Sequence, residues 1–179
     1  MLPMRSTLTH KGSRAIFARI SRKKSGSRKP FDYAPAAKRR NKNIVKEIQK
    51  QWLGSMPWET VLTVNQDLCQ AQKTEPQPQL KTFDAARQLW EKSIPKAMSL
   101  PEVLDVCREC QDLSPFVFNN RNTFAAISKT LIEEWANALP SVEAQIFRTT
   151  VSHYVAGQVT KKELLQVLRH LETRWKVTI

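Results

Sequence analysis

The positive charge of this 179-residue chain is concentrated at its N-terminal end. Residues 1–50 contain fifteen Lys and Arg and only two acids, so they account for the whole formal net charge of +13. Residues 51–179 contain fourteen basic and fourteen acidic side chains and are neutral. A segment with this much unbalanced charge and little apolar surface cannot build a core of its own. The sequence therefore predicts a basic, Ser/Arg/Lys-rich extension, residues 1–43, followed by a globular body.

The extension divides into two parts by composition. Residues 1–21 contain no acid, are rich in Ser, Thr and Arg, and have the amphipathic pattern typical of a mitochondrial targeting segment. Basic clusters separated by Ser, Gly and Pro follow, and we expect them to bind RNA phosphates, since each neutralised phosphate releases counterions. A solvated tail with no role after import is the competing interpretation. The candidate RNA-binding residues are Arg22, Lys23, Lys24, Arg28, Lys29, Lys38, Arg39, Arg40 and Lys42.

The rest of the chain has the pattern of an all-α protein. Apolar side chains recur at three- and four-residue spacing, and the chain contains only four Gly. We expect about seven short amphipathic helices. The apolar face of each is narrow, so each must pack on its neighbours to be stable. The predicted organisation is a helical hairpin over 44–72, a polar, Pro-rich linker over 73–81 as the best candidate for an internal boundary, and a helical domain over 82–179.

Capping residues predict several helix ends. Thr82 and Ser99 are expected to cap helices, and Thr160 with Glu163 matches a capping box. Gly157 is expected to end the helix before that box. The apolar stripe from Ile44 to Trp52 predicts a helix, and the stripe from Phe124 to Ala138 predicts a single long one.

The only motif that suggests chemistry is Cys107-Arg-Glu-Cys110. A CxxC pair can bind zinc or form a redox couple, but a structural zinc site needs four ligands and the chain has no second CxxC. Because both cysteines extend the apolar stripe that begins at Val103, we expect buried core cysteines. We predict no catalytic residue, no metal site, no cofactor and no small-molecule substrate, and hence no enzyme.

Two further expectations concern the tryptophans and the membrane. All five Trp follow residue 50 and fall on apolar stripes, which favours helix packing over base stacking; Trp58, next to Pro57 at a helix start, is the least typical of a core position. No apolar run approaches the ~18 residues of a membrane span, so we predict no transmembrane segment.

Three cysteines without a secretory signal favour a reducing compartment.

One stretch is similar to a known family. Residues 94–131 contain the lead-in Ile94–Ala97, Ser99-Leu100 before a first helix, and Phe118–Asn122 before a second helix with Ala125–Ile127 inside it. These features resemble one unit of the octotricopeptide-type helical repeats found in the FAST-kinase-domain proteins of organelles. The resemblance implies a pair of packed helices and a link to organellar RNA.

Together these patterns predict a non-catalytic structural component of a mitochondrial ribosome, located in the matrix. The basic extension would bind rRNA, and the helical body would contact neighbouring proteins of the complex. Two alternatives stay open: an accessory subunit of a mitochondrial respiratory or ATP-synthase complex, and an organellar RNA-processing factor built on the helical repeat. Another organelle is the alternative location.

Overall fold

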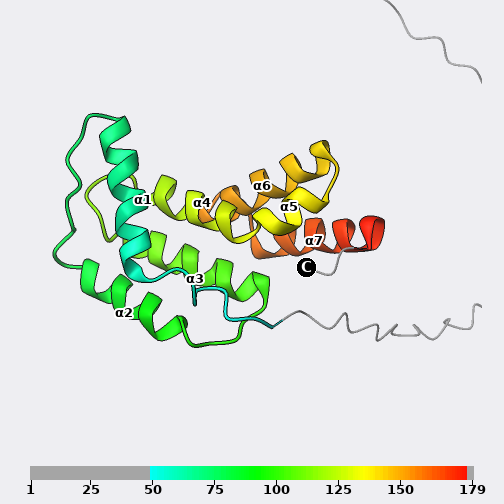
Figure 1. The fold of residues 1–179 in the computed structure, drawn as a ribbon, viewed down its shortest axis with the longest axis horizontal. Coiled ribbons are helices and arrows are strands. Elements are labelled where there is room, and N and C mark those ends of the chain that lie inside the picture. The colour runs from blue at the N-terminus through cyan, green and yellow to red at the C-terminus, as the bar shows by residue number, and fades with distance from the viewer. Residues whose placement is uncertain (1–48, 177–179) are drawn as a thin grey trace, which may run out of the picture. The chain divides into compact units, whose positions relative to one another are not determined.

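The computed structural model describes residues 49–176 (Figure 1), which form an all-α body, as the sequence predicts. Seven helices follow one another with short connections. They are α1 (Trp58–Ala71), α2 (Phe83–Ser93), α3 (Leu100–Leu113), α4 (Asn120–Leu131), α5 (Glu133–Ala138), α6 (Ser141–Val155) and α7 (Lys161–Trp175). None of the helices in this described range is both long enough and apolar enough to cross a membrane.

Local capping chemistry sets several of these bounds as predicted. At the start of α3 the Glu102 carboxylate accepts hydrogen bonds from the Ser99 backbone N (2.7 Å) and hydroxyl (2.8 Å). Glu163 does the same for Thr160 at the start of α7, at 2.8 and 2.7 Å. After α6, Gly157 has φ +75°, a left-handed conformation that residues with a Cβ adopt rarely. The cap at Ser99, the Thr160–Glu163 box and the stop at Gly157 are therefore confirmed, and Ser99 is found to form a box with Glu102 as well.

The helices of the body pack in two layers. In one, α1 packs on α4 and α4 packs on α6; in the other, α2 packs on α3. The layers meet because α3 also packs on both α4 and α6, while α7 packs chiefly on α6. The helix pair implied by the repeat resemblance is present as α3 and α4, which pack directly on each other.

Aromatic side chains fill the end of the core where α1, α2 and α4 meet. Trp58 lies 5.7 Å from Phe83, 6.3 Å from Trp90 and 6.1 Å from Phe116, measured between ring centroids. Trp90 in turn lies 6.2 Å from Phe124. Aromatic pairs at these separations add to the stabilisation from burial. The expectation that Trp58 is atypical of a core is wrong, since it is 2% exposed at the centre of this cluster.

The predicted helix over Ile44–Trp52 does not reach its expected end. Residues 44–48 lie outside the described residues, and Lys50 pairs through its backbone with Met98, at 3.1 and 3.0 Å. Trp52 begins a turn, and its indole Nε1 donates to the Met98 carbonyl at 2.6 Å. These bonds to the segment around Met98 compete with helical bonds, so residues 49–52 are not helical and Trp52 is a buried residue of a turn.

The predicted linker over 73–81 is a loop of one body. Gln79 N donates to the Pro115 carbonyl at 2.7 Å, and Val117 N donates to the Gln77 carbonyl at 2.9 Å. One hydrophobic core contains Trp58 and Val61 from before the loop and residues of every later helix. Within residues 49–176, the segments before and after the loop therefore share one hydrophobic core.

Two smaller corrections concern the helix that Thr82 is expected to cap and the long helix expected over 124–138. Thr82 stands at the N-cap position of α2, but its hydroxyl donates to the Ser114 carbonyl (3.0 Å) instead of capping the helix. The single long helix expected over 124–138 is divided into α4 and α5 at Ile132, whose ψ of 0° departs from helical geometry. The Ile132 side chain is fully buried, so the residue at which the helix breaks is packed in the core.

Candidate functional site

The nine candidate RNA-binding residues, Arg22 to Lys42, lie outside the described residues. The structure does describe the part of the body where the chain from these residues arrives, and the groove next to it. These two features, together with the buried polar groups that hold the helices, make up the candidate site.

An aromatic clamp, defined by Lys50, Trp52, Glu134 and Trp135, holds the first described residues. The Lys50 ammonium lies 4.5 Å from the Trp52 ring centroid and 4.6 Å from that of Trp135. The two rings are 4.7 Å apart, and the Glu134 carboxylate lies 3.7 Å from the ammonium. A cation over an indole face is attracted by the ring quadrupole, so two rings and a carboxylate keep Lys50 on the body.

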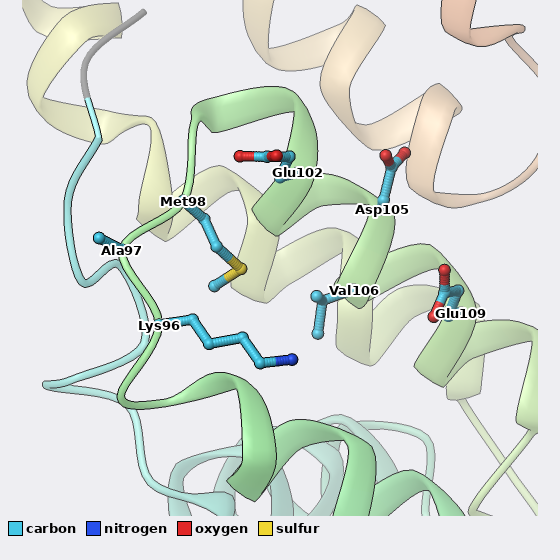
Figure 2. Close-up of a pocket in the computed structure, with 7 residues that line it drawn as sticks. All are labelled: Lys96, Ala97, Met98, Glu102, Asp105, Val106 and Glu109. Carbon is cyan, nitrogen blue, oxygen red and sulfur yellow. The ribbon is translucent and has the colours of Figure 1, made fainter.

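An open groove runs between α3 and the segment that precedes it (Figure 2). Its volume is about 520 Å³, and Met98, the backbone partner of Lys50, contributes to its wall. Glu102, Asp105 and Glu109 line the α3 side because spacings of three and four residues fall on one helix face. Lys96 extends from the opposite segment, and Val106 makes part of the wall apolar.

The charges of this groove suit a cation better than a phosphate. Hydrogen bonds from the Ser99 backbone and hydroxyl lower the pKa of Glu102, so this carboxylate stays ionised at neutral pH. Three carboxylates and the Lys96 ammonium line the groove, and the Lys161 ammonium of α7 pairs with one of the carboxylates, that of Asp105, so negative charge is in excess. A phosphate group placed here would be repelled, so the groove offers no support for RNA binding by this face of the body.

Asp105 joins three helices next to the groove. Its carboxylate accepts hydrogen bonds from the Tyr154 hydroxyl on α6 and from the Lys161 ammonium on α7. The Arg108 guanidinium lies 5.1 Å from the centroid of the Tyr154 ring. Burial and the Asp105 carboxylate raise the pKa of Tyr154 to about 12, so the phenol stays protonated and donates. This joint is structural in character, because its polar atoms are occupied by one another.

The cysteines of the CxxC motif lie in the core, which confirms the buried interpretation. Cys107 and Cys110 are each 0% exposed on the inward face of α3. Burial raises the pKa of the Cys107 thiol and raises that of Cys110 to about 12. The Cys110 thiol lies 3.7 Å from the Ala86 carbonyl, to which it donates. Within residues 49–176 no group of three or more His, Cys, Asp and Glu is arranged to hold a metal ion.

A buried amide network, which sequence reasoning missed, lies between α1 and α4. Asn65 Nδ2 donates to the Phe118 carbonyl at 2.9 Å and to the Thr123 hydroxyl at 3.0 Å. The Asn120 side chain both donates to the Phe116 carbonyl (2.6 Å) and accepts from the Phe116 N (2.9 Å). Asn119 adopts a left-handed φ of +63°. The asparagines that carry the repeat resemblance thus fix the α3–α4 loop.

Sequence patterns offered little signal for Asp105 or Asn65. Asp105 meets Lys161 across 56 residues, and Asn65 meets Thr123 across 58. The one available sign was Asn65 itself, a polar residue on the apolar face of α1, which is 2% exposed. Buried amides are nearly always hydrogen-bonded, so its position indicated a partner without naming it.

Comparison with known proteins identifies no family for this chain. A scan against protein-family models gives no match, and searches of the curated proteins and of the solved structures give none either. The resemblance of residues 94–131 to a helical repeat therefore rests on the residues quoted for it.

Proposed function

We propose that the protein is a non-catalytic structural component of a mitochondrial ribosome. In this proposal the basic N-terminal segment binds rRNA and the helical body contacts neighbouring proteins of the particle. The observation that carries it is the charge partition, with +13 in residues 1–50 and no net charge in residues 51–179. Phosphate contacts of this kind position a protein on RNA without reading its sequence.

The charge of the groove on the body supports assigning RNA binding to the N-terminal segment and protein contacts to the body. The groove along α3 is lined by three carboxylates and one ammonium, a poor site for phosphate. Under this proposal, affinity for RNA comes chiefly from residues 22–42, where basic side chains are accompanied by a single acid, Asp32. The aromatic clamp supports the anchoring role, because Lys50 connects that segment to a packed core.

A segment that binds RNA and a body that binds protein reinforce each other when both sites are in one particle. Once one contact is made, the second becomes intramolecular, and its effective concentration rises. Under this proposal the chain acts as a bridge between rRNA and protein. The matrix location rests on the composition of residues 1–21, which contain no acid.

The experiment that tests the proposal is RNA–protein crosslinking in the native particle, mapped to individual residues. We expect crosslinks concentrated between Arg22 and Lys42. The fourteen Lys and Arg of residues 51–179 serve as an internal control for nonselective reaction. Crosslinks to protein alone would contradict the proposal and favour an accessory subunit of a respiratory or ATP-synthase complex.

The N-terminus of the mature protein provides an independent test. Mass spectrometry of the protein from isolated mitochondria should find cleavage near Phe17–Ser21, which leaves the basic clusters Arg22–Lys24, Arg28–Lys29 and Lys38–Arg40 in place. Cleavage after Arg40 would remove the clusters and leave a body with little net charge, which is incompatible with rRNA binding by the extension.

A further inference from the structure

The C-terminal hairpin carries an apolar groove between α6 and α7. Its volume is about 430 Å³, and its apolar wall is made by Ile146 of α6 with Val167 and Leu171 of α7. Among the helices of the described body, α7 packs chiefly on α6. Leu171 is 1% exposed, so the exposed apolar surface of the groove comes from Ile146 and, in part, Val167. Apolar surface exposed in a groove is typical of an interface.

The exposed side chains of α6 extend this surface. Ile146 is 47% exposed, and Val142, one turn earlier on the same face, is 66% exposed. Val167 lies partly buried in the wall of the groove. A second helix laid along this groove would cover all three side chains.

The charged residues of the groove are arranged in a self-complementary order. Glu163 and Arg174 both line it and lie eleven residues apart on α7. Eleven residues are about three turns, so the two side chains share one face at opposite ends, about 16 Å apart along the axis. The Glu163 carboxylate, which accepts two bonds from Thr160, and the Arg174 guanidinium are both charged at neutral pH.

We propose that the free protein forms a two-fold symmetric dimer through this groove, with α7 packed antiparallel to its copy. A two-fold axis between positions 168 and 169 places Glu163 of each chain against Arg174 of the other. The same axis places Val167 opposite His170 and Gln166 opposite Leu171, between the two ion pairs. Such an interface is isologous, because one surface pairs with itself.

A second copy explains the order of charges along the groove. A parallel helix of the same kind would place Glu163 against Glu163 and Arg174 against Arg174, which is repulsive. The antiparallel arrangement reverses the order and makes both contacts attractive. Glu143 of α6 also lines the groove, and the five N–H donors of Arg174 suffice for it and for the incoming carboxylate.

The dimer does not depend on the proposed function and adds a consequence to it. Two copies bring two basic N-terminal segments, so one dimer has two RNA-binding elements and gains avidity for a single RNA. The contact is small, since it uses one helix hairpin from each chain. It therefore belongs to the class of weak, reversible interfaces.

Sedimentation equilibrium of the full-length protein tests the dimer directly. A salt concentration of about 0.3 M screens repulsion between the two basic segments. We expect reversible monomer–dimer association, and Ile146→Glu should weaken it at least tenfold by burying a charge in the apolar wall. Val117→Glu is the matched control, because Val117 is similarly exposed (44% against 47%) and lies in the α3–α4 loop.

A charge-exchange experiment tests the register. Glu163→Arg and Arg174→Glu should each abolish self-association, since each places like charges together in both contacts. An equimolar mixture of the two variants should form a heterodimer, because every contact is then attractive. Arg174→Glu leaves the Thr160–Glu163 capping box intact, so circular dichroism of this variant separates lost association from lost folding.

Three results would overturn the inference. The first is a wild-type chain that stays monomeric up to millimolar concentration. The second is a dimer that Ile146→Glu leaves unchanged, which would place the contact on another face. The third is a mixture of the two folded charge variants that stays monomeric.

Discussion

The basic N-terminal segment and the helical body divide the chemistry of this protein between them. Residues 1–50 hold all of the net charge, and residues 51–179 hold all five Trp and all three Cys. Three of these Trp (Trp52, Trp58 and Trp90) and all three Cys are buried in the body. The difference teaches that stability and RNA affinity should respond to separate sets of mutations, because stability depends on apolar burial and RNA affinity on countercharge.

The largest expected effect is on the stability of the body. Trp90 is 0% exposed, and its Nε1 donates to the Met56 carbonyl at 2.8 Å, so Trp90→Ala removes both a large buried ring and a buried hydrogen bond. We expect a loss of about 3–5 kcal/mol in the free energy of unfolding, measured by urea denaturation. Trp175→Ala is the matched control: Trp175 is 37% exposed, so its loss should be much smaller. Equal losses would contradict the assigned core.

The next effect is on RNA affinity alone. Substituting Gln at Arg22, Lys23, Lys24, Lys38, Arg39 and Arg40 should weaken binding to single-stranded RNA roughly a hundredfold at low salt. The slope of log affinity against log salt should fall by as much as about 4, because up to six phosphate contacts are lost. Fluorescence anisotropy across a salt series measures both quantities.

A control with the same change in charge keeps this comparison sharp. Six exposed Lys of the body, substituted together by Gln, should leave affinity and slope nearly unchanged. These are Lys73, Lys81, Lys92, Lys96, Lys129 and Lys162. An equal loss in both six-residue variants would mean that RNA responds to total charge and not to the N-terminal segment.

A smaller effect should separate the two tyrosines of the chain, Tyr33 in the basic segment and Tyr154 in the body. In a Tyr33→Phe background, absorbance at alkaline pH reports Tyr154 alone, and we expect its pKa near 12 because of burial and the Asp105 carboxylate. Because this folded-state pKa lies above the ordinary value of 10, Tyr154 contributes stability that is complete below pH 10 and is lost as pH rises through 12.

Asp105→Asn tests the cause of this shift. The substitution should bring the pKa of Tyr154 down and cost about 1–2 kcal/mol of stability at neutral pH, since a charged acceptor is lost from two hydrogen bonds. Glu109→Gln, on the same groove, is the control and should leave the titration of Tyr154 unchanged. A Tyr154 pKa that does not respond to Asp105→Asn would show that burial acts alone.

The smallest expected effect lies where the two regions meet. Lys50→Gln removes the cation between the Trp52 and Trp135 rings and should cost about 0.5–1 kcal/mol in urea denaturation. Lys81→Gln, at an exposed position, should cost less. If the two variants are equally stable, the Lys50 ammonium adds no stability to that of the backbone pairing between Lys50 and Met98.

Much of the fold could be predicted from sequence because its signals are local. The cap at Ser99, the Thr160–Glu163 box, the stop at Gly157 and the inward stripe of Cys107 and Cys110 each depend on residues within one or two turns. The errors share the opposite property. Trp52 satisfies the spacing of a helix face, but its indole bonds to Met98, 46 residues away, and this distant bond decides the local conformation.

The sequence by itself determined three things: an all-α body, the buried state of the CxxC cysteines, and the confinement of net charge to the first 50 residues. Periodicity, capping and charge are properties of neighbouring residues, so they can be read without a structure. The tertiary structure alone decided that the 73–81 loop belongs to one core, that Asp105 joins α3 to α6 and α7, and that α6 and α7 form an apolar groove. Each of these depends on which helices pack together. That packing is determined by the total apolar surface that all the helices bury, and not by any one stretch of sequence.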